Sequence, residues 1–194
     1  MITLTKTKKY LLVSLIPLLV LLSMCIPPLL VQIYGETVQL ESRINPGKDT
    51  FRGRVLYLDY KISSIDKNIV DSAIYTNYKE LKKDYINAYG ILNKKNNYWH
   101  VSRITLEKPK KGQLYLKCSI PTYVLKENFN IDNIKEQKIY INYDLDKYFT
   151  TDKTLYDTIN DYNRISKPYE ETYDYIVKLK IYNGSGQVIE VNKK

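Results

Sequence analysis

The chain has 194 residues, with 30 Lys and Arg against 21 Asp and Glu, one His and two Cys, and its formal net charge is +9. A single histidine without ligand-spaced cysteines excludes the usual sequence patterns of a zinc site. The positive charge has two interpretations: attraction to an anionic surface, or the Lys-, Asn-, Ile- and Tyr-rich composition typical of an AT-rich genome. Because the lysines are scattered rather than grouped in blocks, we favour the second.

The most informative segment is an unbroken apolar run from Leu11 to Val31, and no charged residue lies between Lys9 and Glu36. A helix needs about 20 mainly apolar residues to cross the membrane core, so this run is long enough. Three lysines precede it, whereas the first basic residue after it is Arg43. This asymmetry predicts a single-pass protein of the cell membrane with a cytoplasmic N-terminus. The chain then divides into a basic cytoplasmic tail (1–9), a transmembrane anchor (10–34) and an extracytoplasmic domain (35–194).

Two alternatives to an uncleaved anchor are a cleaved signal peptide and a lipoprotein. A signal peptide has an apolar core of about 7–15 residues and a small-residue cleavage site. This run is longer, and its far end has no such site. A lipoprotein would have a small residue before the lipidated cysteine, where Met24 precedes Cys25. We therefore favour the uncleaved anchor, with Pro27-Pro28 kinking or ending the helix and Tyr34 at the outer interface.

Beyond the anchor, apolar residues mostly alternate with polar ones, as in half-buried strands of an antiparallel sheet. Two hairpins are predicted, one turning at Lys94–Asn97 and the other at Asn183–Gly186. The second turn has the Gly and Asn content that positive φ angles demand. The alternation is clearest in residues 37–41, 56–62, 139–143 and 173–181.

Two helices interrupt the predicted strands. A stripe of apolar residues with helical spacing predicts a helix over 72–84, capped by Asp71 or Ser72. A shorter stripe through Leu155, Ile159 and Tyr162 predicts a second helix after a cap at Thr151 or Asp152, which Pro168 ends. The sequence therefore predicts an α+β fold: a mainly antiparallel β domain with about two short helices, plus one N-terminal transmembrane helix.

Residues that could carry chemistry are few. Cys118 falls on the apolar face of a predicted strand, which favours a buried, inert thiol, and Cys25 lies in the anchor, so the domain has no disulfide partner for it. His100 is predicted to be an exposed strand residue. The carboxylate pairs Asp144/Asp146 and Asp157/Asp161 are more simply solvated charge than acid–base machinery. We therefore expect a non-enzyme without catalytic residues, cofactor or metal.

The segment from Arg52 to Tyr60 reads RGRVLYLDY and resembles the motif of the bacterial GDYXXLXY proteins. Gly53, Leu58 and Tyr60 match the Gly, the Leu and the last Tyr of that motif, whereas Arg54 and Val55 depart from its Asp and first Tyr. Three surrounding segments are also similar to the family: the lead-in at 46–52, the stretch at 143–149 and the final hairpin at 177–191.

The resemblance implies a membrane-anchored, uncharacterised protein, often encoded beside multi-spanning membrane proteins, with no established catalytic residues. A Gly at the start of a strand usually supplies a positive φ, so we expect Gly53 to form a turn or bulge leading into strand 54–62. We favour a structural role for the motif. If it is instead a site, Arg52, Gly53 and Arg54 contact a partner or an anion, with the two arginines on one strand face.

These observations leave three functional hypotheses. The first is an interaction or accessory subunit on the outer side of the bilayer, bound to a multi-spanning membrane protein. The second is a module that binds an envelope polymer or another anionic surface, because 18 of the 20 tyrosines lie outside the anchor and many are interleaved with lysines. The third is a hydrolase with residues that the sequence does not identify. Nucleic acid is not expected as a partner in this compartment.

Overall fold

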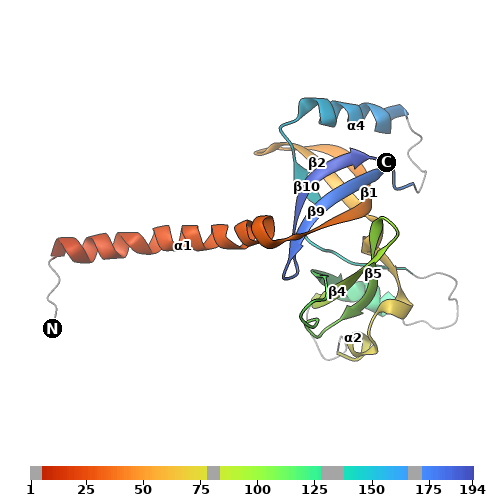
Figure 1. Cartoon of the computed structure of the whole chain (residues 1–194), viewed down its shortest axis with the longest axis horizontal. Coiled ribbons are helices and arrows are strands. Elements are labelled where there is room, and N and C mark those ends of the chain that lie inside the picture. Colours follow the sequence, from red (N-terminus) through yellow and green to blue (C-terminus); the bar gives the residue numbers. More distant parts are fainter. Residues whose placement is uncertain (1–5, 78–83, 128–137, 166–171) are drawn as a thin grey trace.

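The computed structural model describes residues 6–77, 84–127, 138–165 and 172–194. Figure 1 shows a long N-terminal helix, α1 (Lys6–Tyr34), projecting from a β-rich body. Its segment Val13–Tyr34 is long and apolar enough to cross a membrane, and none of its most apolar window is buried against the body. The helix continues through Pro27 and Pro28 to Tyr34, so the two prolines do not end it.

A five-stranded antiparallel sheet forms the larger part of the body, in the order β10-β9-β1-β2-β8. β1 is its central strand: residues 36–42 pair with β9, and residues 42–49 pair with β2. The strands are β1 (Glu36–Asp49), β2 (Gly53–Tyr60), β8 (Lys147–Phe149), β9 (Tyr175–Tyr182) and β10 (Ser185–Lys193).

A three-stranded antiparallel sheet, in the order β5-β4-β6, and a two-stranded ladder, β3-β7, complete the β structure. Single bridges join Leu116 of β6 to Gly184 and Ser119 to Asn142, which ties the smaller sheet to its neighbours. The strands are β3 (Ser64–Asp66), β4 (Tyr85–Lys95), β5 (Tyr98–Thr105), β6 (Tyr115–Pro121) and β7 (Lys138–Tyr140).

The helices of the body are short. They are α2 (Ser72–Asn77), α3 (Thr122–Glu127), α4 (Lys153–Ile165) and the 3-10 turns η1 (Lys61–Ser63) and η2 (Lys67–Ile69). The predicted Asp152 cap is present, because its carboxylate accepts the Leu155 N–H at 3.0 Å. The predicted helix 72–84 has its described part at Ser72–Asn77, and Asp84 is not helical. Residues 78–83 and Pro168 lie outside the described residues, and α3 was not predicted.

One hydrophobic core joins the two larger sheets and α4. The predicted alternation holds: Leu56, Leu58, Tyr60 and Ile62 are all buried. In Figure 1 α4 lies on the upper side of the five-stranded sheet, and β4 and β5 lie below it. The α+β fold with one N-terminal apolar helix is therefore confirmed.

Both predicted hairpins form. The second turns through Asn183 and Gly184, whose φ angles are 49° and 79°. Positive φ at both central positions is the arrangement that matches the twist of two antiparallel strands. The turn is therefore two residues long, and Ser185 and Gly186 already belong to β10.

Candidate functional site

The turn between β1 and β2 contains the start of the motif. Gly53 has a φ of 82°, and open space surrounds the position of a Cβ atom. The Asp49 carboxylate accepts the N–H groups of Phe51 and Arg52 at 3.0 and 2.8 Å, and these bonds hold the pKa of Asp49 below its usual value. Gly53 therefore completes a tight turn rather than a bulge, because its left-handed backbone is costly for other residues.

The two other matching motif residues lie in the core. Leu58 and Tyr60 are 4% and 3% exposed. The Tyr60 hydroxyl donates to the Leu145 carbonyl at 3.1 Å, and the Leu58 N–H donates to the Asp146 carbonyl at 2.8 Å. Burial raises the pKa of Tyr60 far above its usual value, so the hydroxyl stays a donor. These contacts support a structural role for the motif.

The predicted site residues Arg52 and Arg54 do not share a strand face. Arg52 lies in the turn before β2, with its guanidinium 5.0 Å from the centre of the Phe149 ring. Arg54 lies in β2, with its guanidinium 5.9 Å from the centre of the Tyr156 ring. The expectation of a common face was wrong because the strand begins only at Gly53.

Basic side chains gather at this end of the sheet around one exposed aromatic ring. We call Lys48, Phe51, Arg52, Arg54 and Lys147 the apex. Lys48 is directly opposite Arg54 in the β1–β2 ladder, and Lys147 pairs with Tyr57 on the neighbouring strand. Phe51 is 97% exposed. An anion is the group that this arrangement of cations attracts.

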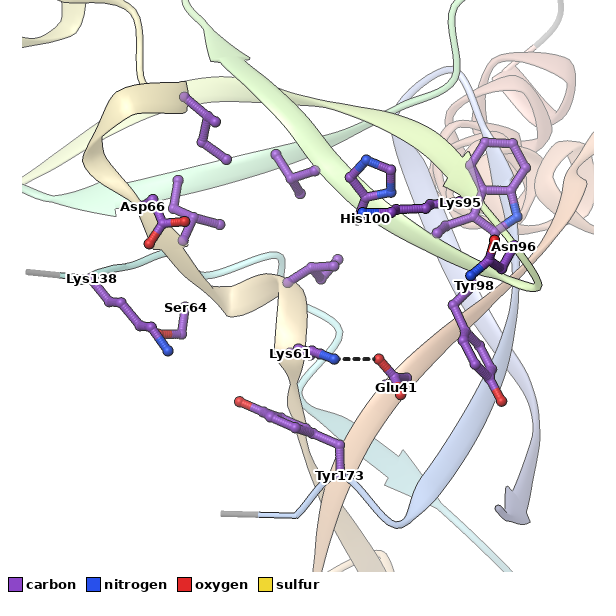
Figure 2. A pocket seen from close by; sticks show the side chains of 15 residues that line it. Glu41, Lys61, Ser64, Asp66, Lys95, Asn96, Tyr98, His100, Lys138 and Tyr173 are labelled. Atoms are coloured by element: carbon purple, nitrogen blue, oxygen red, sulfur yellow. Dashed lines mark hydrogen bonds and ion pairs between the residues drawn. The ribbon is translucent and has the colours of Figure 1, made fainter. Parts of the chain in front are cut away.

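A second candidate is an open cleft of about 470 Å³, which the sequence did not predict. Its walls come from β1, from the η1–β3–η2 segment, from the tip of the β4–β5 hairpin and from residues just before β9. Figure 2 shows labelled side chains from all of these segments around the same space. The lining residues are Glu41, Lys61, Ile62, Ser64, Ile65, Asp66, Ile69, Lys95, Asn96, Tyr98, Trp99, His100, Val101, Lys138 and Tyr173.

Glu41 is the central charged group of one cleft wall. Its side chain is only 13% exposed, and it accepts the ammonium groups of Lys61 and Lys194 at 2.7 and 2.6 Å. Burial alone would raise the pKa of Glu41, but the hydrogen bonds from Lys194 and Lys61 outweigh it and lower the pKa. The carboxylate is therefore ionised at neutral pH and already hydrogen-bonded to two lysines. This suits a group that holds the cleft wall in place better than a general base.

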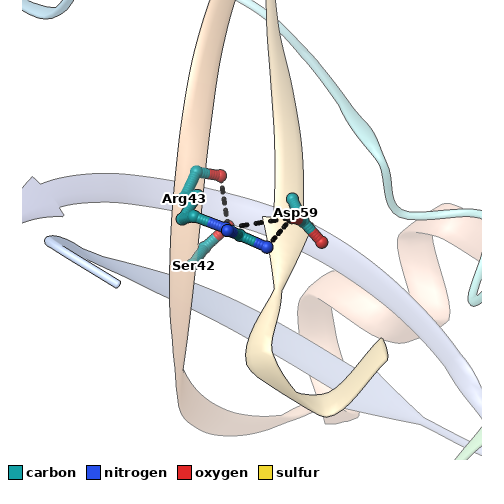
Figure 3. A network of polar contacts seen from close by, with 3 residues as sticks. All are labelled: Ser42, Arg43 and Asp59. Atoms are coloured by element: carbon teal, nitrogen blue, oxygen red, sulfur yellow. Dashed lines mark hydrogen bonds and ion pairs between the residues drawn. The ribbon is translucent and has the colours of Figure 1, made fainter. Parts of the chain in front are cut away.

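One aromatic ring, that of Tyr173, lies beside this charged wall. Lys61 lies 5.8 Å from the centre of the Tyr173 ring, and Arg43 lies 4.9 Å from it. Arg43 in turn donates twice to one Asp59 oxygen, at 3.1 and 2.7 Å, across the β1–β2 ladder. Figure 3 shows this pair beside the buried Ser42, whose hydroxyl donates to the Arg43 carbonyl. The Tyr173 ring therefore connects the Glu41–Lys61 pair of the cleft wall with the Arg43–Asp59 pair, which lies outside the cleft lining.

Two further cations line the cleft, Lys95 at the tip of the β4–β5 hairpin and Lys138 on β7. Within the described part of the chain, no ion pair is formed by Lys95 or Lys138. His100 is exposed on β5, as predicted, and its side chain lines the cleft. Together with the Trp99 and Tyr98 rings, these groups suit a ligand with a flat apolar face and negative charge.

Two other predicted features are found where the sequence put them. Cys118 is 6% exposed on β6, and burial raises the pKa of its thiol to about 12. Asp144 and Asp146 lie in the irregular segment before β8. Among the described residues, no group of three or more His, Cys, Asp or Glu side chains could hold a metal ion.

A family model for GDYXXLXY proteins matches residues 17–190. The chain belongs to the GDYXXLXY family. The match begins inside α1 and ends in β10, so it includes the apolar helix and the body together. No curated protein and no solved structure matches the chain. The family assignment therefore stands on a match that covers most of the chain, despite the changed positions Arg54 and Val55.

The cleft could not be recognised from sequence because its residues come from distant segments. Glu41, Lys61 and Tyr173 belong to three different parts of the chain and meet only through the β1–β2 and β1–β9 pairings. The one local signal was the sequence Tyr98-Trp99-His100, which gathers two aromatic residues and the single histidine. This short sequence does not indicate which distant residues form the rest of the cleft.

Proposed function

We propose that this GDYXXLXY protein is a non-catalytic interaction subunit of the cell membrane. In this proposal α1 crosses the bilayer with its N-terminus in the cytoplasm, and the β-rich body works on the outer surface beside a multi-spanning membrane protein. The observation that carries the proposal is the direct connection between α1 and β1. The helix ends at Tyr34 and the strand begins at Glu36, so Gly35 alone joins them.

The junction leaves no room for a side chain at its single connecting residue. The Gly35 N–H donates to the Val31 carbonyl at 2.9 Å. A Cβ atom at Gly35 would lie 2.2 Å from the Val31 oxygen and 2.9 Å from the Lys180 Cβ atom, well inside contact distance. The end of the helix is therefore seated directly on β9 rather than followed by a flexible linker.

Three further contacts fix the helix on the body. Val31 is 3% exposed, the Tyr34 and Tyr182 rings lie 5.8 Å apart, and the Lys180 ammonium donates to the Gln32 carbonyl at 2.5 Å. Tyrosine is enriched at the membrane–water interface. A domain fixed in this way keeps a constant height and orientation above the bilayer, which favours a partner in the same membrane over one at a distance.

The chemistry of the body favours binding over reaction. Cys118 is buried with a raised pKa, which makes it a poor nucleophile. Glu41 is held ionised by two lysines, whereas a general base works best with a pKa near the operating pH. These properties support a protein that recognises a partner.

The test is photo-crosslinking of the full-length chain in intact cells. A photoreactive amino acid replaces Leu18 or Leu22 in α1, which are exposed, or Tyr123 or Tyr140 on the body. We expect a multi-spanning membrane protein in the crosslinked product. The matched variant carries a long Gly/Ser insertion after Gly35, which should remove the crosslinks made by the body and keep those made by α1.

Recovery of the chain alone at all of these positions would contradict the proposal. Equal crosslinking from the body with and without the Gly/Ser insertion would also contradict it, because the fixed junction would then have no role. A separate check is protease treatment of intact cells, where the body should be accessible if the N-terminus is cytoplasmic.

A second candidate function is the binding of an anionic envelope polymer in the cleft. Lys95, Lys138 and His100 face the same space as the Trp99 and Tyr98 rings, and this combination suits a charged glycan. The test is binding of the detergent-solubilised full chain to isolated envelope fractions over a range of salt. We expect binding that weakens with salt and is lost in the double variant Lys95→Gln/Lys138→Gln. Absent or salt-insensitive binding would exclude this function.

A further inference from the structure

The apex presents an aromatic ring to solvent from a turn whose backbone is held by hydrogen bonds. Phe51 is 97% exposed, more than any other large apolar residue in the described part of the chain. The turn below it is held by the two hydrogen bonds to the Asp49 carboxylate and by the positive φ of Gly53. At 97% exposure the Phe51 ring has no role in the core, and the hairpin tip places it where it can contact an apolar phase outside the body.

The charges around this ring are mostly positive. Lys48 and Arg54 are directly opposite in the β1–β2 ladder, and like charges in this position are destabilising. Arg52 and Lys147 add two more cations close enough to act on the Asp49 carboxylate. That carboxylate already accepts hydrogen bonds from two backbone N–H groups. The apex therefore has four cations against the single Asp49 carboxylate of the turn, which leaves an excess of positive charge.

The position of the apex relative to α1 identifies what it faces. β1 leaves the end of α1, curves across the body and turns back, so the β1–β2 turn lies on the α1 side of the body (Figure 1). Along the axis of α1, the turn is level with the end of that helix near Tyr34 (Figure 1). In a bilayer that α1 spans, this level is the headgroup region of the leaflet that the body covers.

We infer that the apex is a second membrane contact, which binds anionic lipid headgroups of the same bilayer that α1 crosses. Phe51 inserts its ring at the headgroup boundary, and Lys48, Arg52 and Arg54 bind lipid phosphates around it. Together with the Tyr34–Tyr182 pair at the foot of the body, this contact fixes both tilt and rotation of the body. The inference rests on the proposed membrane anchoring, and it adds the lipid class that the body recognises.

The experiment places a tryptophan at the apex of the full-length protein reconstituted in vesicles. Trp99 is the single tryptophan of the chain, so Trp99→Phe removes the intrinsic tryptophan fluorescence and leaves Phe51→Trp as the single tryptophan signal. Lipids with a bromine or nitroxide quencher near the headgroup report contact with the bilayer. Vesicles of phosphatidylglycerol and phosphatidylcholine are compared with vesicles of phosphatidylcholine alone. The matched control is Tyr140→Trp in the same background, at an exposed position on β7.

We expect several-fold stronger quenching of the apex tryptophan in the anionic vesicles, no quenching of the Tyr140→Trp control, and loss of apex quenching in the double variant Arg52→Gln/Arg54→Gln. A tryptophan at Leu29 in α1 reports insertion of the helix independently. If the Leu29 position is quenched and the apex position is not, the apex inference is wrong while the anchoring stands. If neither is quenched, both the anchoring and the inference are overturned.

Discussion

Replacing Glu41 by Gln tests whether the cleft wall is organised by charge. The variant keeps the shape of the side chain and removes the negative charge that Lys61 and Lys194 share. Both lysines are roughly half exposed, at 58% and 46%, so each ion pair belongs to the partly solvated class. Such pairs contribute about 0.2–1 kcal/mol each. We therefore expect Glu41→Gln to lower the free energy of unfolding by about 0.4–2 kcal/mol at neutral pH.

The pH dependence of this difference follows from the pKa shifts. The folded-state pKa of Glu41 is lowered from 4.5, so its contribution is present above that value and is lost as the pH falls through the folded pKa. The folded-state pKa of Lys194 is raised from 10.5, so its contribution is present below that value and is lost as the pH rises through the folded pKa. The difference between the variant and the wild type should therefore be largest between these two values.

The assay is urea unfolding of the full chain in mild detergent, followed by the fluorescence of Trp99, which lines the same cleft. Glu36→Gln on the same strand is the matched control, because Glu36 is exposed and its change should stay within about 0.5 kcal/mol. A Glu41→Gln effect equal to that of the control would refute the reasoning. So would an effect that is the same at pH 3 and pH 7.

Three further predictions concern the body. Gly184→Ala should lower the free energy of unfolding by about 1–3 kcal/mol, because the φ of Gly184 is 79° and the new Cβ atom would lie 2.5 Å from the Tyr115 ring. An unchanged urea midpoint would contradict this prediction. Tyr143→Phe should cost about 1 kcal/mol by removing the buried hydrogen bond to the Ile62 carbonyl, and equal midpoints would show that the bond contributes nothing. The third prediction uses the variant Cys25→Ser, in which Cys118 is the remaining cysteine. Because the pKa of Cys118 is raised to about 12, its thiol should react with a thiol reagent at pH 8 only after the protein unfolds. Prompt reaction of the folded protein would exclude a buried thiol.

The parts of the fold that the sequence predicted are those with a local cause. Alternation placed the buried faces of β1, β2 and β9 correctly, because each strand has one face on the core. The turn at Asn183–Gly184 could be predicted because positive φ angles strongly favour those two residue types. α4 could be predicted from its apolar stripe and its aspartate cap.

The parts that the sequence did not predict depend on pairing over long distances. α3 has only six residues, too few for a periodic stripe, and it follows β6 without a break. The cleft requires Glu41 and Tyr173 to meet, which only the β1–β9 register brings about. The common face expected for Arg52 and Arg54 failed for a local reason: Gly53 between them has a φ of 82°, so the side-chain alternation of the strand does not extend back to Arg52.

The contacts of Tyr60 explain why two separate segments of this chain are similar to the family. Tyr60 and Leu58 on β2 form hydrogen bonds to the carbonyls of Leu145 and Asp146, inside the second segment at 143–149. The two segments are therefore one structural unit that closes β2 against β8. At the changed positions, Val55 is buried and keeps an apolar side chain in the core, whereas Arg54 is half-buried among the basic residues of the apex. The residues that match the family motif build the fold, and the changed residue at the surface alters the charge of the apex. If the apex binds lipid, this chain should depend on anionic headgroups more strongly than a variant in which the motif aspartate is restored by Arg54→Asp.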